Sequence, residues 1–257
     1  MTLAVTWLWI AFGLVLFGAS VFPFYGGATG AAQRLRVIPF AALGMLVFGT
    51  LAVIGRAMTF GAAPQQLLVT SIGRIWMVQI VVGVVSVALA SRRRRDTRIS
   101  ALATINICGF ALAGHANAIS GWLGAAVQAV HLLAAGAWIG GLVALLFALR
   151  EQPSAASVRR FSRVGIICVV LLAVSGACML FINTGAWLPI TYMAYGKLAA
   201  VKITLFAVAL ALAVFNRFYA TTRGAWSLLI RAIGAELGIL ALILGAAVTL
   251  ASLEPYG

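Results

Sequence analysis

Two histidines and several methionines are the side chains of this sequence best suited to bind a soft metal ion. His115 and His131 are the only histidines in 257 residues. Met179 and Met193 follow them in the second half of the chain. Imidazole and thioether groups are ligands for copper, and thioether sulfur favours Cu(I) in particular. We therefore predict a Cu(I) site made of His115, His131, Met179 and Met193.

A further set of polar or reactive residues lies inside long apolar stretches, where it could form a path for an ion. Ionisable groups in such stretches are costly to bury and are usually functional. Cys108, Leu112 and His115 are spaced i, i+4 and i+7, which would put them on one face of a helix. The predicted path residues are Cys108, Trp138, Lys202, Asn216 and Glu236.

Structural interpretations of these residues stay open. A buried methionine often only fills space, and a cysteine in an apolar run often behaves as a small hydrophobic residue. Lys202 can extend its amine to the lipid headgroups. Glu236 can pair with Arg231 or Arg217 near the end of a helix. It can also bond Asn216, and such an anchoring role is favoured over a part in proton or cation passage.

The composition indicates that lipid surrounds these residues. Hydrophobic residues make up 64% of the chain and charged residues 9%, against roughly a quarter charged in soluble domains. Such a composition excludes a soluble enzyme, and the sequence holds no GxxxxGK[ST] phosphate-binding motif. Backbone groups in lipid must be paired within helices or a closed barrel, and the long charge-free runs favour helices. We expect no enzymatic activity.

Charge-free stretches of about 20 residues predict an all-α, polytopic membrane bundle of about eight transmembrane helices. The whole chain, 1–257, is expected to form a single integral membrane domain. The sequence GHANAISG at 114–121 gathers glycine, asparagine and serine, which predicts a turn there. The predicted helices are 3–23, 37–55, 72–91, 99–117, 122–149, 164–184, 198–216 and 232–252.

The basic residues predict the orientation of this bundle. Fourteen of the 18 lysines and arginines fall in the loops on one side of the predicted helices. Short cytoplasmic loops carry an excess of such residues, so both termini are expected outside. The net charge of +14 is then a membrane-orientation signal, and no nucleic-acid partner is expected. In this orientation both histidines lie toward the outer face.

Several short motifs in the second half resemble the copper resistance protein D (CopD) family. They are GHANA (114–118), HLLAAGAWIGGL (131–142), RRFSR (159–163), SG (175–176), YGKL (195–198), NR (216–217) and RAIGAELG (231–238). The segment after NR reads FYATTRG, where similar proteins often have a proline. The family features carried over are His115, His131, Trp138, Gly140, Gly141, Lys202, Asn216 and Glu236.

The resemblance implies a multi-pass copper-handling protein of the bacterial inner membrane. It implies copper transport in copper homeostasis and resistance, with uptake from periplasm to cytoplasm and a periplasmic copper-binding protein as partner. Two alternatives stay open. The two histidines could instead hold a b-type haem for electron transfer. The protein could also present copper at the outer surface, as a chaperone or assembly factor, without transporting it.

Overall fold

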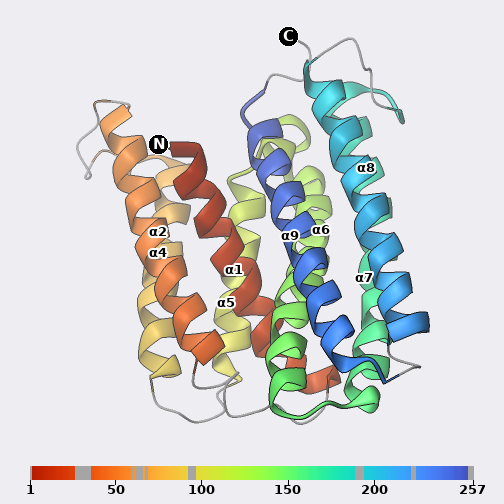
Figure 1. The fold of residues 1–257 in the computed structure, drawn as a ribbon. Coiled ribbons are helices and arrows are strands. Elements are labelled where there is room, and N and C mark those ends of the chain that lie inside the picture. The colour runs from red at the N-terminus through yellow and green to blue at the C-terminus, as the bar shows by residue number, and fades with distance from the viewer. Residues whose placement is uncertain are drawn as a thin grey trace.

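Eight α-helices form a bundle in the computed structural model (Figure 1). The structure describes residues 2–26, 36–59, 61, 66, 69–91, 97–188, 194–220 and 224–253. All regular secondary structure in this part of the chain is helical. The helices are α1 (Thr2–Tyr25), α2 (Ile38–Thr59), α4 (Ser71–Ala90), α5 (Arg98–Leu112), α6 (His115–Glu151), α7 (Ala155–Thr184), α8 (Ala194–Phe215) and α9 (Trp226–Leu250), with a π-helical turn, η2 (Asn216–Ala220), after α8.

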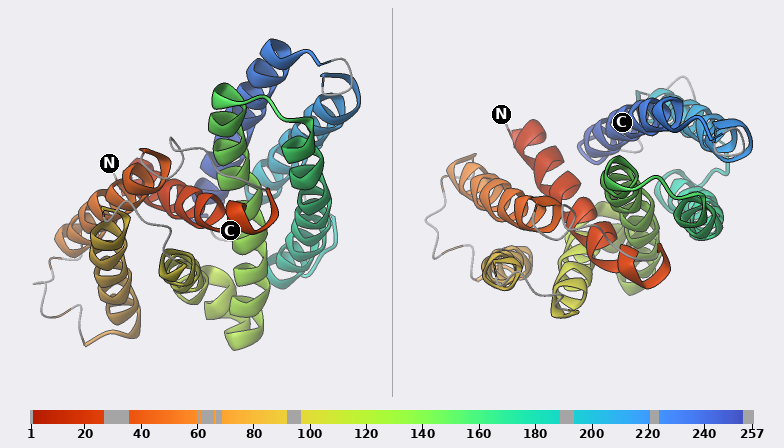
Figure 2. Two further views of the ribbon diagram at one scale, coloured as in Figure 1. Left: turned by 90° about the horizontal axis from the view of Figure 1, so that it is seen from below. Right: turned by 60° about the horizontal axis from the view of Figure 1, so that its bottom comes forward.

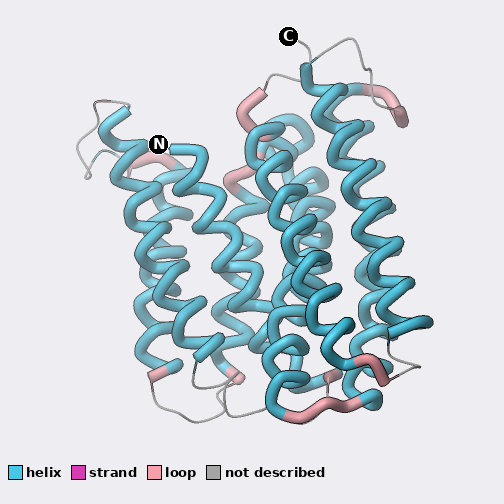
Figure 3. Tube along the Cα trace, viewed as in Figure 1, coloured by secondary structure: helices cyan, strands magenta, loops and turns pink. Residues whose placement is uncertain are grey.

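The predicted class of a polytopic helical membrane protein is confirmed. Seven of these helices are long and apolar enough to cross a membrane. The eighth, α5, has 15 residues and is therefore about 22 Å long, shorter than a hydrocarbon core of about 30 Å. The start of α1 and the end of α9 lie at the same end of the bundle (Figure 1). The described loops, such as the one between α6 and α7, lie at the ends of the bundle (Figure 3).

The turn predicted over 114–121 lies earlier and is followed by a kink. The side-chain amide of Asn117 donates to the backbone oxygen of Leu112 at 2.7 Å, which satisfies a carbonyl at the end of α5. Gly114 is extended, so His115 opens α6 instead of closing the preceding helix. The predicted shared helix face of Cys108, Leu112 and His115 is therefore wrong. A second break follows at Gly121, whose φ of 56° suits glycine.

Other helices begin earlier than their charge-free stretches predicted. The helix α7 begins at Ala155 instead of 164, and α9 begins at Trp226 instead of 232. The Ser154 hydroxyl accepts a hydrogen bond from the backbone N–H of Ser157 and caps α7. Arginines near these helix starts can extend their charges to the headgroups, so the helices continue past the apolar core. Residues near the start of the predicted helices therefore lie farther from the observed helix ends than expected.

The helices form two groups that meet where α1 packs against α6 (Figure 2). One group contains α1, α2, α4 and α5, and the other contains α6 to α9. A Cβ atom on Gly18 of α1 would collide with the backbone oxygen of Gly136 and lie 2.6 Å from the Cα of Gly140. Small residues four apart on a membrane helix let backbones approach in this way. Glycine at 136 and 140 thus brings the two groups into contact.

Candidate functional site

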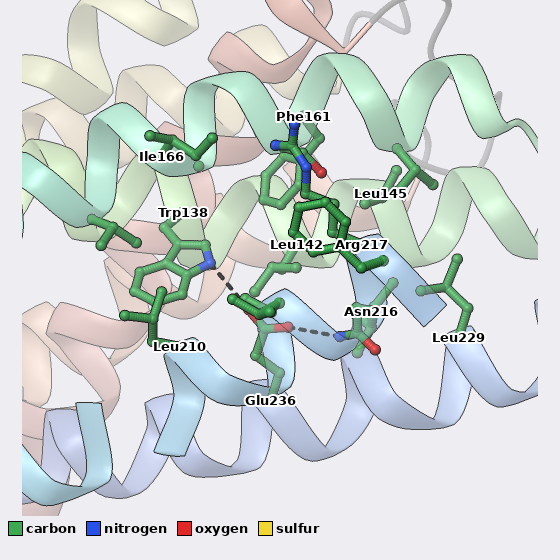
Figure 4. Close-up of a pocket in the computed structure, with 18 of the residues that line it drawn as sticks. Trp138, Leu142, Leu145, Phe161, Ile166, Leu210, Asn216, Arg217, Leu229 and Glu236 are labelled. Carbon is green, nitrogen blue, oxygen red and sulfur yellow. Dashed lines mark hydrogen bonds between the residues drawn. The ribbon is translucent and has the colours of Figure 1, made fainter. Parts of the chain in front are cut away.

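A carboxyl group lies in the centre of the second helix group. Glu236 of α9 is 1% exposed, ten residues from the start of its helix. The indole Nε1 of Trp138 on α6 donates to its Oε1 at 3.1 Å. The amide Nδ2 of Asn216, at the start of η2, donates to its Oε2 at 3.0 Å. Figure 4 shows the carboxyl group between these two donors.

The surroundings of Glu236 differ from those that the sequence predicted. Arg231 is exposed on α9, and no lysine or arginine forms a salt bridge with Glu236 among the described residues. The predicted bond to Asn216 is present. Both hydrogen-bond donors are neutral, and a buried carboxylate is costly without a compensating charge. The carboxyl group of Glu236 is therefore buried without a charged partner among the described residues.

An apolar cavity of about 370 Å³ adjoins this carboxyl group. Trp138, Asn216, Arg217 and Glu236 line it together with aliphatic and aromatic side chains of α6, α7, α8 and α9 (Figure 4). Its size falls within the range of about 300–1,000 Å³ typical of ligand pockets. The few polar groups of the site are thus surrounded by walls that exclude water.

A second polar group lies farther along α6. The Nδ1 atom of His131 and the hydroxyl of Ser175 on α7 lie 2.9 Å apart. The hydroxyl also donates to the backbone oxygen of Leu171, so it accepts from an Nδ1–H of the histidine. The Nε2 atom is then left as an acceptor or ligand. Lys202 of α8 lies within electrostatic reach of His131.

The two polar groups share one face of α6. His131 and Trp138 are seven residues apart, which places them two turns and about 10 Å apart along the same side of the helix. Met179 is one turn beyond Ser175 on α7, on the same side of that helix. The structure thus places the His131–Ser175 pair, between α6 and α7, and the Trp138–Glu236–Asn216 cluster, between α6, α9 and η2, on one side of α6.

Lys202 lies on α8, on the side of the cluster near His131. It lies eight residues into α8, which begins at Ala194, so it is deeper than the single turn that the sequence predicted. Its side chain is partly buried.

Other predicted site residues lie elsewhere or outside the described residues. Cys108 lines a different cavity, of about 400 Å³, between α4 and α5. The structure therefore does not bring Cys108 together with Trp138 or Glu236. The backbone of His115 begins α6, but its side chain is outside the described residues, as is all of Met193. Among the side chains that are described, no three His, Cys, Asp or Glu residues gather as a metal-binding group.

Two polar residues of this region were not among the predicted site residues. Ser175 is buried and orients His131. Arg217 lines the cavity beside Asn216. The sequence signal for Ser175 was that it is the only hydroxyl-bearing residue in the apolar run 164–182. The position of Arg217 depends on η2, and such π-helical turns are common at functional sites but have no simple sequence pattern.

Gly140 and Gly141, carried over from the family resemblance, have packing roles. Gly140 contacts α1 as described above. A Cβ atom on Gly141 would lie 2.6 Å from the hydroxyl of Tyr25 and 2.7 Å from the ring of Phe161. These glycines therefore fit α6 against α1 and α7.

Comparison with known proteins gives matches over most of the chain. A model of the N-terminal domain of copper resistance protein D-like proteins matches residues 1–125, and the copper resistance protein D model matches residues 155–250. Inner membrane protein YebZ of Escherichia coli (strain K12) is 30% identical over 239 residues, which cover 85% of this chain and 82% of that protein.

A second relative matches over nearly its full length. Copper resistance protein D of Pseudomonas syringae pv. tomato is 27% identical over 289 residues, covering 94% of this chain and 93% of that protein. No solved structure matches the chain significantly. The family matches, the relatives and the apolar helices together identify a multi-pass inner-membrane protein that belongs to the copper resistance protein D family.

Proposed function

We propose that this protein carries copper across the inner membrane along the face of α6 that holds His131 and Trp138. The observation that carries this proposal is the buried carboxyl group of Glu236, which is bonded only to neutral donors among the described residues. One of these donors, Trp138, lies two turns from His131 on α6. The name of the Pseudomonas relative, a copper resistance protein, supports copper as the ion. The protein's role would then be copper homeostasis and resistance.

The geometry suggests an order of events. Copper, as Cu(I), would first bind the free Nε2 atom of His131, with the thioether of Met179 as a candidate second ligand. His115 and Met193 remain proposed ligands at the same end. The ion would then move toward Glu236, whose carboxylate would neutralise its charge in the apolar surroundings. A periplasmic copper-binding protein would deliver the ion.

The direction of uptake follows from the proposed orientation, with both termini in the periplasm. Accessibility labelling tests this orientation in a variant whose native cysteines are replaced. Thr97→Cys should be protected from a membrane-impermeant thiol reagent applied to intact spheroplasts, whereas Trp187→Cys should react. The reversed pattern would place His131 toward the cytoplasm and overturn the direction of transport.

Transport itself is tested in sealed proteoliposomes that contain a Cu(I)-sensitive fluorescent chelator. The parent protein should admit copper faster than protein-free vesicles. His131→Ala and His115→Ala should each lower copper binding by more than the roughly 10–100-fold that loss of a supporting group costs. Both variants should remain folded in the membrane, as judged by size-exclusion chromatography in detergent.

Two results would contradict the proposal. Copper bound at the parent's normal affinity but never released inside the vesicles would indicate a chaperone or assembly factor. A haem absorption band in the purified parent, lost in both histidine variants, would indicate an electron-transfer protein.

A further inference from the structure

The cavity beside Glu236 opens sideways toward the membrane. The helix α7 packs along α6, and α8 packs along α9, but α7 and α8 have little direct contact with each other (Figure 2). Four side chains that line the cavity are also exposed on the membrane-facing surface. They are Ile166 and Val170 of α7, Val214 of α8 and Phe218 of η2. The entrance therefore faces lipid.

The interior of the cavity suits an apolar ligand. Its volume of about 370 Å³ is more than twice that of an engineered apolar cavity of about 150 Å³ that stays dry and binds benzene. Leu142 and Leu145 of α6 and Ile233 of α9 form its inner wall and are at most 2% exposed. A void of this size and composition would lose many van der Waals contacts if it remained empty.

A cationic group lies at one end of this apolar space. The Nη1 atom of Arg217 is buried and has no hydrogen-bond partner among the described residues. The cavity's carboxyl group, on Glu236, is bonded to Trp138 and Asn216 instead. The Arg217 side chain as a whole is partly buried, and its guanidinium carbon lies 5.4 Å from the ring centroid of Phe218. An unpartnered buried N–H gains from an anion, and phosphate matches the guanidinium geometry. Arg217 also lies at the end of the bundle where α5 begins and α6 ends, and the described residues Arg98 and Arg150 belong to those helix ends (Figure 1).

We propose that an anionic phospholipid binds here, with its phosphate at Arg217 and one acyl chain inserted between α7 and α8. In the proposed orientation Arg217 lies near the cytoplasmic leaflet, where anionic lipids attract basic residues. The inserted chain fills the cavity and separates the Trp138–Glu236–Asn216 cluster from the open bilayer. This binding does not depend on copper transport.

Photo-crosslinking tests the proposal with the intact protein in nanodiscs, in the absence of copper. The probe is phosphatidylglycerol with a diazirine on one acyl chain, and mass spectrometry maps the labelled residues. Label should reach Leu142, Leu145 or Ile233, which lipids around the protein cannot touch. The same probe as a diacylglycerol, which lacks the phosphate, should label them about tenfold less, the effect of losing a hydrogen bond to a charged group.

Two variants separate insertion from general lipid contact. A Cβ atom on Gly165 has no atom within 4 Å, and this residue lines the cavity, so Gly165→Leu should fill the space and abolish labelling of the inner wall. Gly238→Leu is the matched control, because this glycine of α9 also has open space but does not line the cavity. Arg217→Gln should remove the preference for phosphatidylglycerol.

Three results would overturn the proposal. They are an unlabelled inner wall in the parent, labelling that survives Gly165→Leu, and equal labelling by the probes with and without phosphate. A failure of copper uptake in the same preparation would bear only on the transport function, since labelling is measured without copper.

Discussion

Each half of the bundle buries a tryptophan followed by isoleucine in the helix that contacts the other half, but the two indole rings have different surroundings. Trp9 of α1 packs edge-on against Phe110, with 5.0 Å between ring centroids, inside an apolar cluster. Trp138 of α6 packs edge-on against Phe206 at 5.9 Å and also donates to Glu236. The same side chain thus fills space in one half and positions a carboxyl group in the other.

A buried amide pair in the first half is less completely hydrogen-bonded than the carboxyl group of Glu236 in the second half. The second half also contains buried atoms without a partner among the described residues, namely Gln128 Oε1, Asn183 Oδ1 and Arg217 Nη1. In the first half Gln79 of α4 donates to the backbone and side-chain oxygens of Asn106 on α5 at 2.9 and 3.3 Å. The remaining amide atoms, Gln79 Oε1 and Asn106 Nδ2, have no partner among the described residues, nor does the hydroxyl of Ser86. In the second half both carboxyl oxygens of Glu236 accept hydrogen bonds.

This contrast follows from the cost of charge. An unpaired neutral amide in a protein interior costs about 1–3 kcal/mol, which a well-packed bundle tolerates. A buried ionisable group costs more, so it persists only where neighbours or a ligand compensate it. Under the proposed transport function, the first half would support the fold and the second half would hold the path for copper.

The largest expected effect comes from separating the two halves. Gly140→Leu places a side chain against the backbone of α1 at Gly18 and Leu14. Because backbone atoms cannot move aside cheaply, the folded protein should be lost from the membrane. Thermal unfolding and membrane yield measure this loss. Gly234→Leu is the control, since no atom lies within 4 Å of a Cβ there; equal behaviour of the two variants would show that this contact is dispensable.

The next effect compares the buried polar groups of the halves. Glu236→Gln keeps the size of the side chain and removes its charge, so copper uptake into vesicles should fall to the level of protein-free vesicles. Gln79→Leu in the first half should lower stability by about 1 kcal/mol and leave uptake near that of the parent. Equal loss of uptake in both variants would refute the division of roles between the halves.

The sequence predicted the fold better than the site, for physical reasons. Apolar length and basic-residue placement indicate helices and their number, because lipid permits few other backbone arrangements. The bend after Leu112 was misplaced, because it depends on the side chain of Asn117 and on two glycines rather than on hydrophobicity. The predicted starts of α7 and α9 were also too late. These helices continue into the headgroup region, where arginine side chains are hydrated.

Among the site residues, those on α6 and α9 could be predicted as functional because each is polar within an apolar helix. Their partners could not be predicted. The distance between Trp138 and Glu236, 98 positions apart in sequence, depends on how α6 and α9 pack. Cys108 had the right spacing from His115 for one helix, but the break between them directs it toward α4.

A smaller effect is expected from paired serine variants. Ser175→Ala removes the hydroxyl that orients His131, and loss of such a supporting group typically lowers metal affinity about 10-fold or more. Ser86→Ala removes a buried hydroxyl that has no partner among the described residues, so it should keep or raise thermal stability and leave copper binding unchanged. Isothermal titration with a Cu(I) complex measures both. Copper affinity unchanged in Ser175→Ala would exclude His131 as an oriented ligand.

The smallest effect distinguishes the two tryptophans with which the comparison began. Trp138→Phe retains an aromatic ring beside Phe206 and removes the hydrogen bond to Glu236. Hydrogen bonds between membrane helices average about 0.6 kcal/mol, so the initial rate of copper uptake should fall roughly threefold. Trp9→Phe keeps the ring next to Phe110 and should alter thermal stability without altering the uptake rate. The assignment to the second half would be reversed if uptake fell threefold in Trp9→Phe and stayed normal in Trp138→Phe. The indole N–H would then matter at the position where no carboxyl group accepts its hydrogen bond.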